Sequence, residues 1–374
     1  MNFYYNPVRL HWGEQCLSEL KGELESLQAK KILIIKWSDN ALDNQAGKKL
    51  YEAVGGCEVM ELTFERSNPD IHELFELYEQ HKTERPDVII AVGGGSVLDM
   101  AKSLAAILDN QYSSVEELRE AIQQKNTGKP ECPWIGIPTT AGTGSEVTCW
   151  ATVWDSEKDA KLSLENKENY AYSAYVDSEF TISMPMNLVV SSALDAVAHA
   201  TESYWAKAHN MVSEIYALKA ISMIMENLEK LVETKEKKYY LAMAEASMLA
   251  GRAFSNTKTT ACHSISYPLT LGYGIPHGVA VSMLLPSLLQ INWEKIGDTE
   301  ALLKAYGVKT SVEAGEKVEH LLDMAGISHR LSDWKVKKEQ LGTIAEHCFT
   351  KGRIENNPVD LSKEDVEKIL ENIW

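Results

Sequence analysis

Residues 87–108 read DVIIAVGGGSVLDMAKSLAAIL, and this stretch decides the class of fold. The apolar residues at its start are typical of a buried strand, and the pattern at its end is typical of a helix. Between the two lie Gly93, Gly94, Gly95 and Ser96. Glycines at such a turn let backbone N–H groups approach a phosphate closely, and the helix N-terminus adds a favourable dipole. The stretch matches neither the GxGxxG fingerprint nor a Walker A loop. On this segment alone, a plain strand-to-helix turn therefore stays open as an alternative.

Other strand-like runs occur in the first half of the chain: KILIIKW from Lys31, CEVMELTF, and PWIGIP from Pro133 to Pro138. Amphipathic patterns such as DIHELFELYEQHK lie between them. This alternation predicts parallel βαβ units covered by helices on both faces. After Pro185 long helical patterns take over, so we predict a Rossmann-like α/β dinucleotide-binding domain over residues 1–181 and an all-helical domain over residues 182–374. The order of the strands in the sheet cannot be derived from the pattern.

The composition excludes several classes of function. The 374 residues include 37 basic and 54 acidic ones, a net charge of −17 that argues against a nucleic-acid partner. No apolar run approaches the roughly 18 residues of a membrane span, and MNFYYNPVRLHWGEQ does not look like a signal peptide. We therefore expect a cytoplasmic protein with reduced cysteines and no membrane association. Net charge does not decide what a desolvated cleft binds, so an anionic small molecule remains compatible with this balance.

A second loop of small residues, IPTTAGTGSEVT at residues 137–148, also follows a predicted strand. It offers the hydroxyl groups of Thr139, Thr140, Thr143 and Ser145, which suit ribose, phosphate or amide groups. Two such loops at adjacent strand ends fit a dinucleotide in the crevice at the carboxyl edge of a parallel sheet.

Four residues form a candidate metal site. In ALDAVAHATES, Asp195 and His199 are four positions apart and project from one face of a helix, and ACHSISYPLTLGYGIPHGVAV supplies His263 and His277. Three imidazoles and a carboxylate suit a divalent transition metal, Fe²⁺ or Zn²⁺. The histidines are 64 and 14 residues apart, so spacing alone leaves a hydrogen-bonded core histidine as the alternative for each.

Together, GGGSVLDMAK, PTTAGTGSEVT, the Asp-x-x-x-His helix and the Pro-His-Gly turn resemble the iron-containing (group III) alcohol dehydrogenases, down to the tail NNPVDLSKEDVEKIL. The resemblance implies a dehydroquinate synthase-like fold, an active site between the two domains, and a homodimer. It implies metal ligation by Asp195, His199, His263 and His277. It implies cofactor binding by Gly94, Gly95, Ser96, Asp99, Thr139, Thr140, Thr143, Ser145 and Lys161.

The same resemblance implies the chemistry. One divalent metal, with Fe²⁺ expected and Zn²⁺ the alternative, would act as a Lewis acid on a carbonyl oxygen while NAD(P)H delivers hydride. An acidic residue after the first strand would favour NAD over NADP. Trp37 occupies the usual position of that residue, with Asp39 two further on. We assign this role to Asp39 and expect NAD(H), although Lys36 or Ser38 would tolerate NADP if Asp39 does not reach the ribose.

Two segments depart from the family pattern. Tyr267 begins a Tyr-Pro-Leu-Thr segment where many members have His-Pro-Leu-Gly, so Tyr267 either replaces a histidine proton relay or only shapes the pocket. The second departure is SNTKTTACH, where Lys258, Thr259 and Thr260 replace small or apolar residues. A cation and two hydroxyls beside a metal suit a substrate oxyanion, and Arg252 is a further candidate; a solvated lysine at a helix end is the alternative.

With SYPLT and WATVWD, this second variant is similar to the branch that reduces phosphonoacetaldehyde to 2-hydroxyethylphosphonate. We therefore expect an anionic aldehyde as substrate. Three alternatives remain: a general short-chain alcohol dehydrogenase or lactaldehyde reductase, a lyase of the dehydroquinate synthase kind, and a non-catalytic protein that kept the fold. The four intact metal positions speak against the last, because a buried charge cluster is costly to keep without a purpose.

Overall fold

The computed structural model describes residues 3–158, 160–350 and 352–374, which form two compact units. The α/β unit comprises Asn6–Thr140 and Ser145–Ser183. The helical unit comprises Met184–Trp374 together with residues 3–5 and the short segment Ala141–Gly144. The main boundary between the two units therefore lies between residues 183 and 184. The sequence pattern predicts it between residues 181 and 182.

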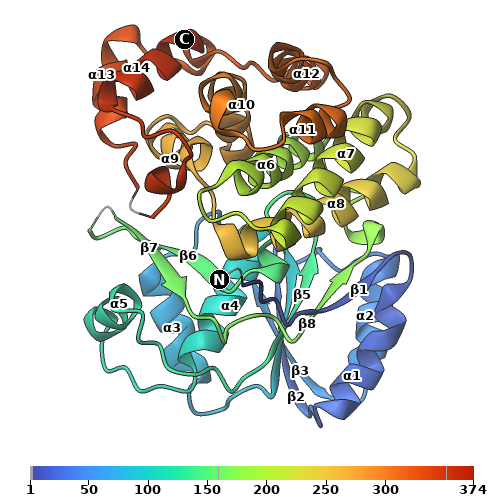
Figure 1. The fold of residues 1–374 in the computed structure, drawn as a ribbon. Coiled ribbons are helices and arrows are strands. Elements are labelled where there is room, and N and C mark those ends of the chain that lie inside the picture. The colour runs from blue at the N-terminus through green and yellow to red at the C-terminus, as the bar shows by residue number, and fades with distance from the viewer. Residues whose placement is uncertain (1–2, 159, 351) are drawn as a thin grey trace. The chain divides into compact units, whose positions relative to one another are not determined.

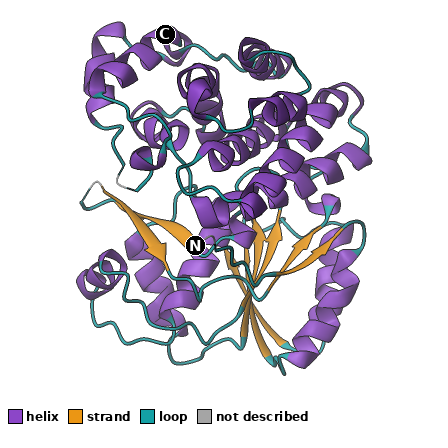
Figure 2. Cartoon of the chain, viewed as in Figure 1, coloured by secondary structure: helices purple, strands orange, loops and turns teal. Residues whose placement is uncertain are grey.

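A six-stranded parallel sheet forms the centre of the α/β unit (Figure 2). Its strand order is β1-β8-β5-β4-β2-β3, and every neighbouring pair is parallel, as the alternation of strands and helices predicts. The strands are β1 (Arg9–Trp12), β2 (Lys31–Lys36), β3 (Glu58–Thr63), β4 (Val88–Gly93), β5 (Trp134–Pro138) and β8 (Ser173–Val176). A separate antiparallel hairpin joins β6 (Trp150–Asp155) to β7 (Ala160–Glu165).

Helices cover both faces of the sheet, because the central strands β2, β4 and β5 are apolar on both sides (Figure 1). On one face, α1 (Leu20–Ser26) and α2 (Gln45–Val54) pack on Ile34 and Ile90. On the other lies α4 (Gly95–Ile107), with α3 (Ile71–His81) beside it; α5 (Val115–Gln123) packs against α3 and β7. Side-chain caps begin several of these helices; Asp70, for instance, accepts a hydrogen bond from the backbone of His72.

The helical unit contains no strand among its described residues, as the long apolar periodicities predict. Its main helices are α6 (Met186–Trp205), α7 (Met211–Thr234), α8 (Lys237–Thr257), α9 (Ala261–Tyr273), α10 (His277–Asn292), α11 (Thr299–Tyr306), α12 (Ser311–Met324), α13 (Leu341–Glu346) and α14 (Lys363–Asn372). Helix α6 is buried along almost its whole length, because alanine and serine allow α7, α8 and α10 to pack closely around it. Polar side chains on α6 are thereby held inside the unit. No helix of the described residues is long and apolar enough to cross a membrane.

The turn between α9 and α10 sets the position of His277. Gly274 ends α9 with a φ of +67°, and Pro276 precedes the first residue of α10. Gly278 lets α10 approach α6 closely, because a Cβ atom there would lie 2.3 Å from the backbone oxygen of Ser191. This close contact brings the start of α10 next to the middle of α6.

Candidate active site

The four predicted metal ligands meet in the helical unit. Asp195 and His199 lie on α6, His263 on the first turn of α9, and His277 at the start of α10. The distances from Asp195 Oδ1 are 3.4 Å to His263 Nε2 and 4.0 Å to His277 Nε2. His199 Nδ1 lies 3.8 Å from Asp195 Oδ2, and its ring stacks on that of His263 with centroids 4.2 Å apart. Chain segments far apart in sequence thus converge on one carboxylate.

The donor set fits a divalent cation. The ligand atoms of Asp195, His263 and His277 lie within 4.8 Å of one another. Asp195 Oδ1, His199 Nδ1 and His263 Nε2 are buried and have no hydrogen-bond partner among the described residues. Unpaired polar atoms are costly in a protein interior, and one carboxylate with imidazole nitrogens is a set that Fe²⁺ and Zn²⁺ accept. We conclude that these residues are suited to hold such an ion.

At Asp195 and His199, the surroundings favour the deprotonated form, which is the form that binds a metal. Burial, together with the neighbouring histidines, lowers the pKa of His199 to about 3 although Asp195 opposes this, so its imidazole is neutral. Burial raises the pKa of Asp195, but His199, His263 and His277 outweigh it and hold the carboxyl well below its usual range. At His263 burial is outweighed by Glu202 and Asp195, which raise its pKa to about 10.

Tyr267 lies beside this cluster. Its ring is parallel to that of His277, with centroids 6.0 Å apart and an interplanar angle of 8°. The residue is half-buried on α9, four positions after His263. The structure therefore puts Tyr267 next to a ligand, as the sequence segment suggests.

The first glycine loop of the α/β unit has the geometry of a phosphate cradle. Gly94 precedes α4 and has no side chain with which to cap it, so the helix begins with bare backbone N–H groups. A Cβ atom on Gly94 would lie 3.2 Å from Thr140, and one on Gly93 would collide with Val97. Ser96 accepts a hydrogen bond from the backbone of Asn68. Gly94, Gly95 and Ser96 thus lie at the start of α4, and their contacts with a cofactor stay predictions.

The second loop follows the neighbouring strand, because β5 pairs with β4 and the backbone N–H of Thr139 donates to Gly93. Thr139, Thr140 and Ser145 belong to the α/β unit, whereas Thr143 lies in the segment that packs with the helical unit. In that segment Gly144 has a φ of +56° and leaves no room for a Cβ against Gly251. Glycine is therefore required in this loop for packing as well as for access.

Two further predicted cofactor residues lie in the α/β unit. Asp39 is exposed after β2 and accepts a hydrogen bond of 2.6 Å from Thr63. Lys161 lies on β7 opposite Trp154, with its ammonium 5.7 Å from the centre of that indole ring. Their contacts with a cofactor stay predictions.

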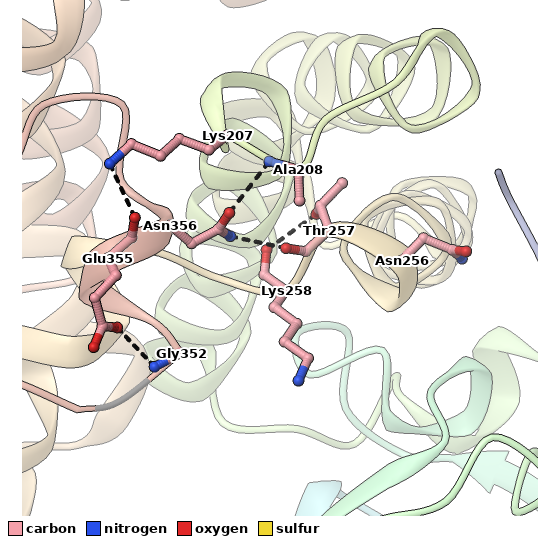
Figure 3. A pocket seen from close by; sticks show the side chains of 8 residues that line it. All are labelled: Lys207, Ala208, Asn256, Thr257, Lys258, Gly352, Glu355 and Asn356. Carbon is pink, nitrogen blue, oxygen red and sulfur yellow. Dashed lines mark hydrogen bonds between the residues drawn. The ribbon is translucent and has the colours of Figure 1, made fainter. Parts of the chain in front are cut away.

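The linker between α8 and α9 carries the predicted substrate residues. Lys258 has φ 64° and ψ 179°, a backbone conformation that is essentially restricted to glycine. Asn356 fixes the backbone on both sides of it. Its amide donates to the carbonyl oxygen of Thr257 (Figure 3) and to that of Thr259. Figure 3 shows the Lys258 side chain directed away from Asn356. A strained lysine held by several hydrogen bonds indicates a functional constraint.

The other substrate candidates differ in how much of their polar surface is already engaged. Thr259 is 3% exposed, and its hydroxyl has no hydrogen-bond partner among the described residues. The hydroxyl of Thr260 instead donates to Glu202 and accepts from the Trp205 indole. The guanidinium of Arg252 lies over the ring of Tyr216, 5.2 Å from its centre. The Thr259 hydroxyl is therefore available to a ligand, and Nε of Arg252 is likewise buried without a hydrogen-bond partner among the described residues.

A groove of about 490 Å³ runs beside this linker (Figure 3). Its lining residues are Lys207, Ala208, Asn256, Thr257, Lys258, Gly352, Glu355 and Asn356. None of the four metal-ligand candidates is among them, so we describe it as a flank of the linker and not as the reaction site.

Comparison with known proteins identifies the family. Residues 7–178 match the family model described as iron-containing alcohol dehydrogenase, and residues 189–374 match that of the C-terminal part of the Fe-containing alcohol dehydrogenase family. Lactaldehyde reductase of Escherichia coli (strain K12) is 31% identical over 317 residues, which cover 82% of each chain. The chain belongs to the iron-containing alcohol dehydrogenase family.

Two further known proteins are similar to this chain over nearly its whole length. The NAD-dependent methanol dehydrogenase of Bacillus methanolicus is 29% identical over 99% of each chain. The crystal structure of sulfoacetaldehyde reductase from Bifidobacterium kashiwanohense in complex with NAD⁺ has a TM-score of 0.91 at 26% identity, covering 100% of this chain and 98% of that one. The predicted fold class and the prediction of an oxidoreductase are confirmed.

The sequence patterns missed two buried residues of the chain. Glu202, on α6, contacts His263 and the start of α9. Its position three residues after His199, on the same helix face, is a signal that could have identified it. The other is Lys102, a fully buried lysine on α4, three residues after Asp99.

Lys102 joins the two cofactor loops within the α/β unit. Its ammonium donates to the hydroxyls of Ser145 and Thr148 and to the carbonyl of Trp150, at 2.8 to 3.0 Å. Ser145 in turn donates to Asp99 at 2.6 Å. The polar atoms of Asp99 and Ser145 are therefore engaged with each other, which indicates that they shape the cofactor loops.

We expect the Lys102→Met substitution to loosen the second loop. It leaves buried acceptors unpaired, at a cost of about 1–3 kcal/mol each, so the unfolding temperature should fall. The KM for NADH should rise about tenfold, equivalent to about 1.4 kcal/mol, while the KM for the aldehyde changes less. Thermal unfolding and steady-state kinetics measure both effects, with Lys48→Met on the exposed face of α2 as the control. An unchanged KM for NADH would show that the network does not position the loop.

Proposed function

We propose that this enzyme reduces a small anionic aldehyde, phosphonoacetaldehyde, to 2-hydroxyethylphosphonate with NADH and a bound Fe²⁺ ion. The observation that carries the proposal is the Lys258-Thr259 pair. A lysine held in a backbone conformation typical of glycine stands next to a buried hydroxyl that has no partner, and His263 follows four residues later. Cation and hydroxyl together suit a phosphonate oxygen.

Each part of the chain has a stated role in this proposal. A metal held by Asp195, His199, His263 and His277 would supply Lewis-acid polarisation of the substrate carbonyl. The backbone N–H groups after Gly94 would hold the pyrophosphate of the cofactor, which would supply the hydride. Lys258 and Thr259 bind the phosphonate and orient the aldehyde carbon. We assign proton transfer to the product oxygen to Tyr267, beside His277.

The deciding experiment is NADH oxidation by the metal-loaded enzyme with four aldehydes side by side. Phosphonoacetaldehyde and sulfoacetaldehyde carry anions, whereas lactaldehyde and propanal are neutral. We expect a kcat/KM at least about tenfold higher for phosphonoacetaldehyde than for either neutral aldehyde, because a charge-assisted hydrogen bond contributes about 1.5–3 kcal/mol. Faster reduction of sulfoacetaldehyde would keep the anion site and change the substrate. Equal rates for all four would overturn the proposal.

The similarity to lactaldehyde reductase supports a second candidate, a general reductase of short neutral aldehydes. Preference for lactaldehyde in the same assay would establish it. Net NADH consumption on addition of aldehyde would exclude a lyase that only recycles its cofactor. No turnover of any kind by the metal-loaded protein would point instead to a binding protein.

Cofactor preference follows from Asp39 in this proposal. Its carboxylate accepts from Thr63 at the end of β3. In this proposal the same carboxylate would bind a ribose hydroxyl and repel a 2′-phosphate. We expect Asp39→Ala to raise the NADPH-to-NADH ratio of kcat/KM about tenfold or more. Asp43→Ala, at an exposed carboxylate four residues later, should leave the ratio unchanged. If the ratio of Asp39→Ala also stays constant, Asp39 does not contact the ribose.

A further inference from the structure

Glu202 is a fully buried carboxylate that accepts several hydrogen bonds from the start of α9. Its Oε1 accepts from the backbone N–H groups of Thr260 at 3.0 Å, Cys262 at 2.7 Å and His263 at 3.4 Å, and from the Thr260 hydroxyl at 2.7 Å. Its Oε2 lies in close contact with Nδ1 of His263. One side chain on α6 thus holds both the backbone and the imidazole of a metal-ligand candidate on α9.

The contacts of Oε1 cap α9. The residue before this helix, Thr260, makes no side-chain cap of its own, so the first N–H groups of α9 need another acceptor. Glu202 supplies it from a neighbouring helix, and its negative charge also interacts favourably with the positive end of the α9 dipole. The start of α9, and with it the Cα position of His263, is therefore fixed relative to α6.

The contact of Oε2 determines the tautomer of His263. Four donors converge on Oε1 of Glu202, an arrangement that stabilises an ionised carboxylate. The ionised carboxylate can only accept, so Nδ1 of His263 carries a proton. The other nitrogen, Nε2, is then the one that faces Asp195 Oδ1 at 3.4 Å, and it has no hydrogen-bond partner among the described residues.

We propose that Glu202 is the positioning residue of the metal centre: it fixes the start of α9 and orients the His263 imidazole so that Nε2 is presented to the ion. Glu202 itself stays outside the ligand set, because both of its oxygens are engaged by donors. Such outer contacts hold a ligand in one geometry and make it a better base. The inference concerns metal binding alone, so it stands or falls separately from the choice of substrate.

The Glu202→Gln substitution tests the role of the tautomer. The amide oxygen of glutamine can still accept from the backbone of α9, which leaves the amide NH₂ facing Nδ1 of His263. Nδ1 must then act as the acceptor, and the proton moves to Nε2, the nitrogen needed for the metal. We expect the affinity of the metal-free, full-length protein for Zn²⁺, and for Fe²⁺ without oxygen, to fall about 10–100-fold. Competition with a chromophoric chelator measures it without substrate or cofactor.

Two further variants separate positioning from general stability. Glu202→Ala removes the cap and the imidazole contact, so both metal affinity and unfolding temperature should fall. Asp298→Ala removes the cap of α11, where Asp298 accepts from Ala301, and should lower stability by about 1 kcal/mol with unchanged metal affinity. The proposal is overturned if Glu202→Gln binds Zn²⁺ as tightly as the unaltered protein. It is equally overturned if Asp298→Ala weakens metal binding as much as Glu202→Gln does.

Discussion

Asn in place of Asp195 should nearly abolish both metal binding and turnover. Asp195 is the only carboxylate among the predicted ligands, and its Oδ1 is the atom to which His263 and His277 are both close. An amide of the same size removes the negative charge and presents an N–H group to the ion. Loss of the metal removes several kcal/mol of charge stabilisation from the reaction, which corresponds to about a thousandfold in kcat.

Metal content per chain and NADH oxidation at saturating aldehyde are the two measurements. Both should fall together, and excess Fe²⁺ should restore only a small part of the rate. The control is Asp298→Asn in the same unit, an equal exchange of carboxylate for amide at a helix cap that asparagine fills as well as aspartate. An Asp195→Asn variant that keeps its metal and works within tenfold of the unaltered enzyme would remove Asp195 from the metal centre.

The metal centre shows how far a sequence pattern reaches. Asp195 and His199 can be paired from helical spacing alone, because residues four apart share a helix face. His263 and His277 join them through the α9–α10 turn and the close approach of Gly278 to Ser191, and neither feature leaves a periodic signal. From the sequence, only the resemblance to a family places all four residues in one metal site.

The α/β unit has a similar division between local and long-range features. The apolar runs of β2, β4 and β5 are long enough to be predicted as strands, and the glycine loop is visible because it lies between a strand and a helix. The strands β1 and β8 have four residues each and lie more than 160 residues apart, so their pairing depends on contacts that no local pattern contains. Lys102 was missed for the same reason, since the groups that accept hydrogen bonds from its ammonium begin at Ser145.

Glycine in place of Lys258 should make the protein more stable and less selective. The native φ of 64° and ψ of 179° cost a lysine about 1–3 kcal/mol, a strain that glycine does not have. Part of this gain is lost, because glycine increases the freedom of the unfolded chain by about 0.4–1 kcal/mol. A net gain of about 1 kcal/mol corresponds to a rise of about 2–4 °C in the unfolding temperature of a unit of this size.

The same substitution removes the cation proposed to bind the substrate. We expect kcat/KM for phosphonoacetaldehyde to fall about 10–100-fold, mostly through KM, while that for propanal stays within about threefold. Lys258→Ala should show the same loss without the gain in stability, because alanine is also strained at positive φ. This pair of variants separates the charge from the backbone conformation.

Lys207→Ala is the matched control for selectivity. Lys207 lines the same groove, but its ammonium donates to the carbonyl of Glu355 and to Asp360, so its removal should not change the preference between aldehydes. Equal losses for phosphonoacetaldehyde and propanal in Lys258→Gly would refute the anion site. A lower unfolding temperature in Lys258→Gly would instead show that the lysine is not strained. If stability rises and only the anionic aldehyde is lost, the backbone strain at Lys258 is maintained for substrate recognition.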